Sequence, residues 1–455
     1  MGVIELGLVT DHDETVDEPA AARRLGSPRE IRRVLVAVAA ALCLLLCTAS
    51  APPHSFAPAQ LWSIPLLSGQ DSFISADDQV YVFTGTAGGN RRLSAYGLRT
   101  GKLRWTVPEL DDAAWIGTVQ SGVIMLPTGR ATVEFDTDNG GVGFREFNRE
   151  TIAIDAATGR QLWRLPGEVA ASHGDLALLT EWDEQGSTVR TLRAVGLHDG
   201  IPAWQNSPAA VQSWTTSEDL GRLVTATGEG LVQVLDFADG SVQTSRKLPW
   251  AGRATSGDRS TDISTEGQQL VVRNVAGSKA TVTAYDLASL TERWHLTSDT
   301  LNGFYGCGPV MCLNDASGVA GYDRLTGRRL WQRASGGWAV PVGPDRLILE
   351  DGQEGARHAL LDSHTGATLA DLGTAGIVWD YQDTASTAYV LIRTTSPPQR
   401  TALGEVDEHS GEIRLRGLID EMQDYGCHAE GTLLLCATAD GRLTVTETAW
   451  FTAAG

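Results

Sequence analysis

The chain has 455 residues, of which 42% are hydrophobic and 20% are charged, a composition typical of folded globular domains. Its formal net charge is −20, so the phosphate backbone of a nucleic acid would be repelled, and we expect no nucleic-acid partner. Fifty glycines indicate many tight turns.

The N-terminal segment predicts a membrane anchor. Residues 1–33 contain the acidic stretch DHDETVDEP without apolar periodicity and are expected to form a disordered cytoplasmic tail. Residues 34–51 begin with the uncharged run VLVAVAAALCLLLCTA, and three arginines lie just before it. Such flanking charges place the preceding residues in the cytoplasm, so we predict an uncleaved transmembrane signal anchor.

Two points on this segment stay open. A cleaved signal peptide ending at Ala49-Ser50-Ala51 is the alternative, although the 33-residue leader favours the anchor. Residues 52–58 follow as a Pro-rich spacer. The expected location is therefore the cell membrane, single-pass, with an extracytoplasmic domain over residues 59–455.

An eleven-residue motif recurs through this domain. AIDAATGRQLW (153–163) has ungapped copies beginning at residues 95, 194, 234, 284, 321, 360 and 405. Position three is Asp in six of the eight copies, position seven is Gly in seven, and position eleven is Trp in five. The copies lie 37 to 58 residues apart, a period typical of four-stranded propeller blades.

The motif has the chemistry of a strand–turn–strand joint. An Asp at a strand end can accept hydrogen bonds from turn amides, and Gly supplies the positive φ of the turn. The Trp can pack on a neighbouring blade and donate its N–H to a backbone carbonyl. We assign a structural blade-docking role, since no catalyst needs eight copies, to Asp155, Gly159, Trp163, Trp105, Trp204, Asp286, Trp294, Asp323, Gly327 and Trp331.

The complete pattern predicts an all-β propeller of four-stranded blades. Residues 424–447 resemble the first three strands of a further unit, and residues 59–66 resemble a lone fourth strand. Pairing the two would close the ring and leave no open edge. A literal count gives nine units, but known rings usually have about 4 to 8 blades, so we predict eight, with seven to nine open.

The motif resembles the tryptophan-docking motif of quinoprotein-type (PQQ-binding-like) β-propellers, over roughly residues 59 to 449. That family includes quinoprotein dehydrogenases and the BamB-like, non-enzymatic branch, so the resemblance implies the fold and leaves the activity open. The family's enzymes hold PQQ with calcium and commonly use two adjacent cysteines, which this chain lacks. We predict no cofactor, no metal and no catalytic residue.

The extracytoplasmic cysteines form two pairs. Cys307–Cys312 and Cys427–Cys436 each follow a Tyr-Gly and straddle a glycine-containing turn, which predicts two hairpin disulfides in an exported chain. A four-cysteine zinc site is the alternative, although neither spacing is C-x-x-C. The stretch DTDNGGVGF (136–144) predicts a solvated insertion loop, with weak calcium binding as the alternative.

These observations favour a membrane-anchored protein-binding scaffold whose partners are unknown envelope or membrane proteins. The alternatives are a PQQ-dependent dehydrogenase and an extracytoplasmic ligand sensor.

Overall fold

The computed structural model describes residues 58–66, 71–85, 91–110, 113, 115–137, 140–207, 210–217, 219–252, 259–299, 301–334, 337–350, 357–378, 388–407 and 409–448. The predicted tail, the membrane anchor and nearly all of the spacer lie outside these residues. No helix in the described part of the chain is long and apolar enough to span a membrane. Residues Phe56–Gly455 form one compact unit.

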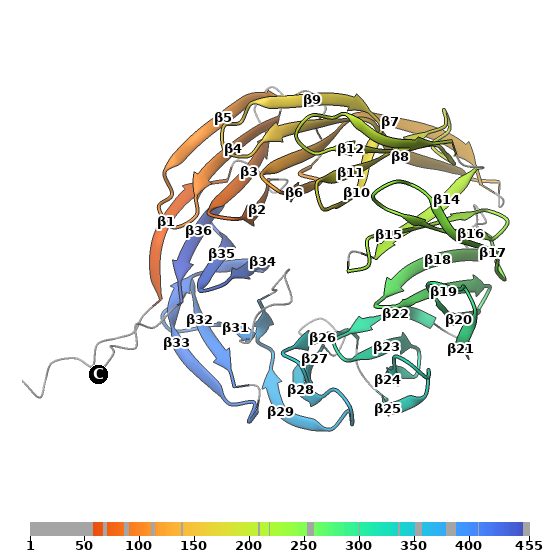
Figure 1. Cartoon of the computed structure of the whole chain (residues 1–455). Coiled ribbons are helices and arrows are strands. Elements are labelled where there is room, and N and C mark those ends of the chain that lie inside the picture. Colours follow the sequence, from red (N-terminus) through yellow and green to blue (C-terminus); the bar gives the residue numbers. More distant parts are fainter. Residues whose placement is uncertain are drawn as a thin grey trace, which may run out of the picture. The chain divides into compact units, whose positions relative to one another are not determined.

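The regular elements of the described residues are β-strands, arranged as consecutive antiparallel four-stranded meanders that we call blades 1 to 9 (Figure 1). Blades 1 to 3 consist of β2 (Ser72–Ala76), β3 (Gln79–Gly85), β4 (Arg91–Gly97) and β5 (Leu103–Leu110); β6 (Thr118–Gln120), β7 (Val123–Asp136), β8 (Val142–Asp155) and β9 (Gln161–Pro166); and β10 (Glu168–His173), β11 (Leu176–Trp182), β12 (Val189–Gly196) and β13 (Pro202–Asn206).

Blades 4 to 6 follow in the same pattern. They consist of β14 (Val211–Ser217), β15 (Arg222–Thr227), β16 (Leu231–Asp236) and β17 (Val242–Lys247); β18 (Arg259–Glu266), β19 (Gln269–Ala276), β20 (Lys279–Asp286) and β21 (Glu292–Ser298); and β22 (Leu301–Cys307), β23 (Val310–Asp315), β24 (Gly318–Asp323) and β25 (Arg329–Arg333).

Blades 7 to 9 complete the ring, and the fourth strand of blade 9 comes from the N-terminal end of the domain. They consist of β26 (Ala339–Val342), β27 (Arg346–Glu350), β28 (His358–Asp362) and β29 (Thr368–Gly373); β30 (Gly376–Ile377), β31 (Ala388–Arg393), β32 (Arg400–Val406) and β33 (Ile413–Asp420); and β34 (Met422–Glu430), β35 (Leu433–Thr438), β36 (Arg442–Glu447) and β1 (Ala59–Pro65).

The predicted propeller of four-stranded blades is present, and the number of blades depends on what is counted. The described residues contain seven four-stranded sheets and one eight-stranded sheet. The eight-stranded sheet joins blades 3 and 4 through a single backbone pair, Val189 with Val211. Eight is therefore the number of hydrogen-bonded sheets, whereas the four-stranded units number nine, as the literal repeat count gives.

Hydrophobic clusters between neighbouring blades hold the ring together. In most blades the first strand lies toward the central opening and the last strand lies outside (Figure 1). The second strand of each blade contributes buried residues to the core. Nine clusters are found in the described residues, and each spans one junction. The closing cluster packs Val80 and Val82 of blade 1 against Leu435 and Val445 of blade 9. No blade buries its faces alone, so the ring is the stable unit.

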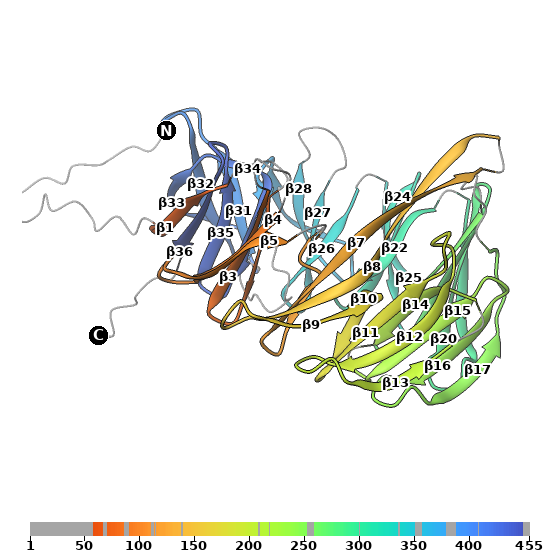
Figure 2. The ribbon, with the colours of Figure 1, turned by 90° about the horizontal axis from the view of Figure 1, so that it is seen from above.

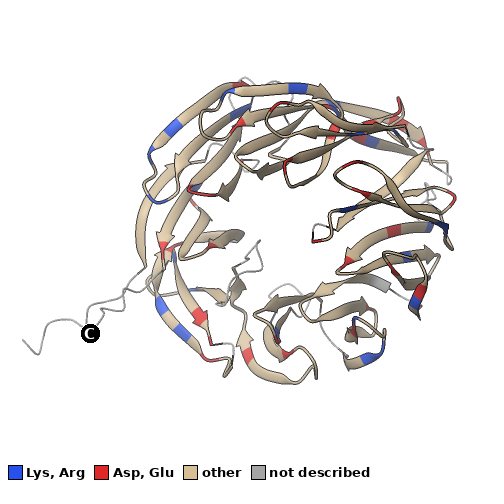
Figure 3. Cartoon of the chain, in the orientation of Figure 1, with Lys and Arg blue, Asp and Glu red and all other residues tan. Residues whose placement is uncertain are grey.

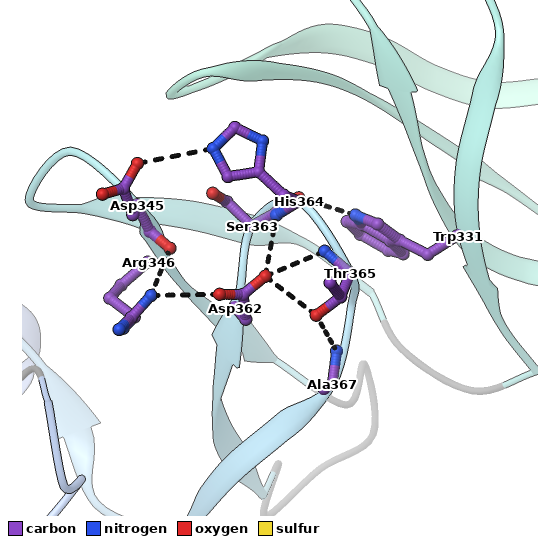
Figure 4. A network of polar contacts seen from close by, with 8 residues as sticks. All are labelled: Trp331, Asp345, Arg346, Asp362, Ser363, His364, Thr365 and Ala367. Carbon is purple, nitrogen blue, oxygen red and sulfur yellow. Dashed lines mark hydrogen bonds and ion pairs between the residues drawn. The ribbon is translucent and has the colours of Figure 1, made fainter.

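The motif turn between the third and fourth strands follows one pattern, shown for blade 7 in Figure 4. The Asp362 carboxylate accepts hydrogen bonds from the Thr365 amide at 2.9 Å and from its hydroxyl at 2.8 Å. These bonds lower the pKa of Asp362, the Thr365 hydroxyl having the largest effect. Asp155, Asp286 and Asp323 accept the corresponding bonds in their own turns. The ionised aspartate at position three of the motif therefore stabilises the turn that leads into the fourth strand of the same blade.

Tryptophans on the fourth strands join six pairs of adjacent blades. In each case the indole Nε1 donates to the carbonyl of position four of the next motif. The pairs are Trp62 with Leu98 (2.7 Å), Trp105 with Ala156 (2.9 Å), Trp163 with Leu197 (2.7 Å), Trp204 with Phe237 (2.9 Å), Trp294 with Arg324 (3.1 Å) and Trp331 with Ser363 (2.7 Å). Trp62 lies on β1, so the same joint links blade 9 to blade 1.

The stretch predicted to be an insertion loop lies at the end of a long hairpin: Thr137, Gly140 and Gly141 lie between the strands, whereas Asp136 and Val142–Phe144 belong to them. β7 and β8 have 14 residues each and pair from Val123–Asp155 out to Asp136–Val142 (Figure 2). The predicted loop was therefore too wide, because alternation through Arg130–Phe135 continues β7 to Asp136, and β8 begins at Val142. Residues 138–139 at the tip lie outside the described residues.

Candidate functional site

A cavity lies where the ring closes, between blades 9 and 1. We call it the closure groove; its volume is about 590 Å³. Its walls come from the inner strands of blades 9 and 1, from β6 of blade 2 and from the segment that leads into β6: Ser72–Ala76, Trp115, Ile116, Val119 and Gly426–Glu430. The closed ring therefore brings together segments that are about 350 residues apart in the chain, as the sequence separation of Ser75 and His428 shows.

One end of the closure groove is polar. The Ser75 hydroxyl donates to Glu430 Oε2 at 2.9 Å, and its Oγ lies 3.3 Å from His428 Nε2. The His428 ring is buried and stacks on Phe73, with the ring centroids 5.2 Å apart. Ser75 therefore connects the carboxylate of Glu430 and the imidazole of His428 across the junction of blades 1 and 9.

The other end of the closure groove is apolar and aromatic. Trp115 is 46% exposed, and Ile116 and Val119 are partly buried beside it. An exposed tryptophan combines a large apolar ring with an N–H donor, which is why tryptophan is enriched at binding surfaces. The groove thus offers an aromatic anchor next to hydrogen-bonding groups.

A second groove has the same design. It has a volume of about 300 Å³ and lies between the inner strands of blades 5 and 6, beside the segment that leads into blade 7. Trp338, which is 50% exposed, packs on Tyr305 with a centroid distance of 4.7 Å. The Tyr305 hydroxyl accepts a hydrogen bond from the Ala339 amide at 2.8 Å, and burial raises its pKa. We call this the Trp338 groove.

Both predicted disulfides are present, and both lie in the inner hairpins that form these grooves. Cys307–Cys312 links β22 to β23, two residues after Tyr305 of the Trp338 groove. Cys427–Cys436 links β34 to β35, and Cys427 itself lines the closure groove. Each disulfide therefore clamps a strand that contributes a groove wall.

The predicted docking residues lie at the blade junctions, outside the two grooves. Among them, Asp286 also lines a third cavity, between blades 4 and 5. Sequence reasoning did not find the residues of the polar end. Ser75 and His428 belong to no motif, and only ring closure places them together. Trp115 and Trp338 carried a signal, because both are tryptophans outside position eleven and near a first strand.

The described residues contain no group of three or more His, Cys, Asp or Glu side chains that could hold a metal ion. The adjacent cysteine pair of the PQQ enzymes has no counterpart, since the four cysteines in these residues pair with partners five and nine residues away. The residues present do not fit that cofactor site.

Comparisons with known proteins find one family model and several solved structures that are similar to this chain. A family model described as outer membrane protein assembly factor BamB matches residues 148–337. BamB from Moraxella catarrhalis aligns with 86% of this chain and 99% of its own length at 15% identity and a TM-score of 0.47. A eukaryotic initiation factor aligns with 78% of this chain and 90% of its own length, at 8% identity and a TM-score of 0.52. A quinohemoprotein alcohol dehydrogenase from Pseudomonas putida aligns with 63% of this chain and 62% of its own length, at 14% identity and a TM-score of 0.38.

At these identities the similarity to solved structures extends to the fold alone. No curated protein matches the chain. The family model and the blade architecture together support a PQQ-like β-propeller repeat family.

Proposed function

We propose that this PQQ-like propeller is a protein-binding scaffold that holds segments of partner proteins in its inner-strand grooves. One observation carries the proposal: each groove combines a half-exposed tryptophan with polar side chains between the inner strands of adjacent blades. Exposing a tryptophan to water gains nothing for folding, whereas burying it against a partner removes a large apolar area from water.

The disulfides support a binding role. A cross-linked hairpin keeps its shape before a partner arrives, so less conformational freedom is lost on binding. They also support the proposed location outside the cytoplasm, because structural disulfides persist in oxidising compartments. We propose that residues 34–51 anchor the propeller to the membrane there.

Site-specific photo-crosslinking in the native membrane tests the scaffold proposal. A photoreactive phenylalanine at Ile116, beside Trp115, should cross-link one reproducible protein partner. The same probe at Leu325, which is 68% exposed on an outer turn, is the matched control and should not. Trp115→Ala should reduce the cross-link at Ile116 by tenfold or more, roughly the effect of losing an interface hot spot.

Two results would contradict the scaffold. One is equal cross-linking from Ile116 and Leu325, which would mean that contacts are non-specific. The other is a cross-linked partner whose yield is unchanged by Trp115→Ala and by Trp338→Ala, which would remove the grooves from the interaction.

A further inference from the structure

The hairpin of β7 and β8 continues past the four-stranded part of blade 2 (Figure 2). β6 pairs with β7 only between Val123 and Met125, and β9 pairs with β8 only between Glu150 and Ile154. Residues 130–136 and 142–148 therefore form a two-stranded extension, with which no further strand of the described residues pairs. A two-stranded ribbon is only marginally stable by itself, so what covers its two faces matters.

One face of the extension packs on blade 3. Phe147 is buried, and its ring lies directly on Gly186, where a Cβ would clash with it. Arg145 donates to the Gln185 carbonyl at 3.1 Å and covers the Phe135 ring, with its guanidinium carbon 4.8 Å from the ring centroid. Gln185 and Gly186 belong to the turn between β11 and β12. This turn therefore supports the inner face of the hairpin and holds the extension in place.

The opposite face points to solvent. Alternation along the two strands places its charged and apolar side chains together, and we call this set the outer hairpin face: Arg130, Glu134, Asp136, Val142, Phe144 and Glu146. Phe144 is 67% exposed and Val142 is 55% exposed. The strand register sets Phe144 opposite Glu134 and Val142 opposite Asp136. An exposed apolar pair thus lies directly beside an acidic pair.

The outer hairpin face has an excess of negative charge. Glu146 forms an ion pair with Arg130. Glu134 and Asp136 form no ion pair with any residue that the structure describes. Basic residues are available elsewhere, since Figure 3 shows them interspersed with acidic residues around the ring. A cation that arrived together with an apolar surface would gain here, because docking on Phe144 removes the water that screens both carboxylates.

The same charge argues against two other occupants. A second copy of this chain that docked face to face would bring its own unpaired carboxylates, and like charges would meet. An anionic lipid surface would be repelled for the same reason. The chemistry of the face fits a surface that is basic and apolar together.

We propose that the outer hairpin face binds an extended, positively charged segment of a partner protein. An apolar side chain of the segment packs on Phe144 and Val142, and flanking Lys or Arg side chains bind Glu134 and Asp136. An extended segment fits because its alternate side chains repeat at the spacing of those on a strand. The face shares no residue with the closure groove or the Trp338 groove, so this site and the proposed groove function can fail separately.

Fluorine NMR at a single position tests the proposal on the full-length protein in a nonionic detergent. 4-(Trifluoromethyl)phenylalanine in place of Phe144 reports on the outer hairpin face itself. Titration with acetyl-Lys-Leu-Lys-Leu-Lys-amide should shift its resonance saturably, with half-saturation at roughly millimolar concentration or below. The peptide with Glu in place of Lys and the peptide with Ser in place of Leu should each bind about fivefold more weakly or less.

Two double variants separate this site from the general charge of the protein. Glu134→Gln with Asp136→Asn should weaken binding of the lysine peptide about threefold or more, as expected for losing two exposed charge pairs. Asp175→Asn with Asp219→Asn is the matched control. It removes two exposed carboxylates from the turns between the first and second strands of blades 3 and 4, at the other end of the blades, and should leave binding unchanged. All four side chains are exposed, so both variants should fold.

Four results would each overturn the proposal. The lysine peptide causes no saturable shift, or the glutamate or serine peptide binds as tightly. Glu134→Gln with Asp136→Asn weakens binding no more than the control pair does, which would reduce the effect to net charge. The resonance shifts when the protein is concentrated without peptide, which would make a second copy of the chain the occupant.

Discussion

Position seven of the motif is set by the neighbouring blade as well as by its own backbone. Gly159 has φ +73°, and a Cβ added there would lie 2.6 Å from the Trp105 ring. Glycine at this position is therefore required twice, by the turn and by the indole that covers it. Leu290 shows the converse, since a side chain is accepted where no indole arrives.

Gly159→Ala should consequently be more destabilising than an ordinary positive-φ substitution. We expect a loss of about 2–4 kcal/mol in the free energy of unfolding, from backbone strain and overpacking together. Gly267→Ala is the matched control: φ is +56° and the space around its Cβ is open, so about 1 kcal/mol is expected. Urea denaturation of both variants measures the difference, and equal losses would contradict the role of Trp105.

The docking bond itself can be tested at Trp163. Trp163→Phe keeps an aromatic ring but leaves the Leu197 carbonyl without its donor, so we expect a loss of about 1–3 kcal/mol. Trp338→Phe at the half-exposed Trp338 should change stability by less than about 0.5 kcal/mol. Chemical denaturation at pH 7 provides the comparison. If Trp163→Phe left the free energy of unfolding unchanged, the hydrogen bond to Leu197 would contribute nothing to stability.

The ionised motif aspartates make the fold sensitive to acid. Hydrogen bonds from Arg293 and then Ser289 lower the pKa of Asp286 to about 2. A lowered folded-state pKa gives stability that is present above the ordinary value near 4 and is lost as the pH falls toward 2. Asp286→Asn should be less stable at pH 7 and should lose less stability than the wild type between pH 4 and pH 2. Urea denaturation of the wild type and of Asp286→Asn at pH 7 and between pH 4 and pH 2 tests this prediction.

At the scale of the element, the disulfides stabilise short hairpins. Cys427 and Cys436 lie opposite each other on β34 and β35. Replacing both with alanine should lower the free energy of unfolding by about 2–3 kcal/mol, as expected for closing a short loop. The same double substitution at Cys307 and Cys312 should have a slightly smaller effect because its loop is shorter. Unfolding curves of both variants, with reduced wild type as the reference, measure this.

The elements were largely predictable because the repeat carries its own alignment. The alternation of apolar residues predicted the strands, and the spacing from Asp to Trp in the motif predicted the joint between the third and fourth strands. The β7–β8 hairpin was missed because DTDNGGVGF has turn chemistry over its whole length, while its strand pairing depends on residues on either side. A local pattern identifies a turn but not how far the flanking strands continue beyond it.

At the scale of the whole molecule, β1 decides whether the ring is closed. It pairs with β36 from Ala59–Glu447 to Pro65–Arg442, and Trp62 docks on blade 1. Removing residues 1–66 should therefore lower the melting temperature and reduce cooperativity, because blade 9 loses its outer strand. Removing residues 1–52 leaves β1 in place and should change neither. Thermal unfolding by circular dichroism distinguishes the two, and identical curves would show that closure contributes nothing.

The geometry of the whole molecule also explains why the candidate sites could not be predicted from the sequence. The polar end of the closure groove requires Ser75 and His428 to meet, and nothing local relates them. Position eleven of the blade 4 motif is Thr244 and position seven of the blade 5 motif is Leu290, and both departures from the motif are visible in the sequence. Only the structure shows that Leu290 is fully buried in the apolar cluster of that junction.

Closure by β1 also has a consequence for biosynthesis. The first strand of the ring emerges from the ribosome long before β36, its partner, has been made. During that interval β1 has an unpaired edge, and the other blades can only stack in a line behind it. Completion of the ring is thus an end-of-synthesis event, and a chain that stops before residue 442 keeps two open ends for quality-control proteases to recognise.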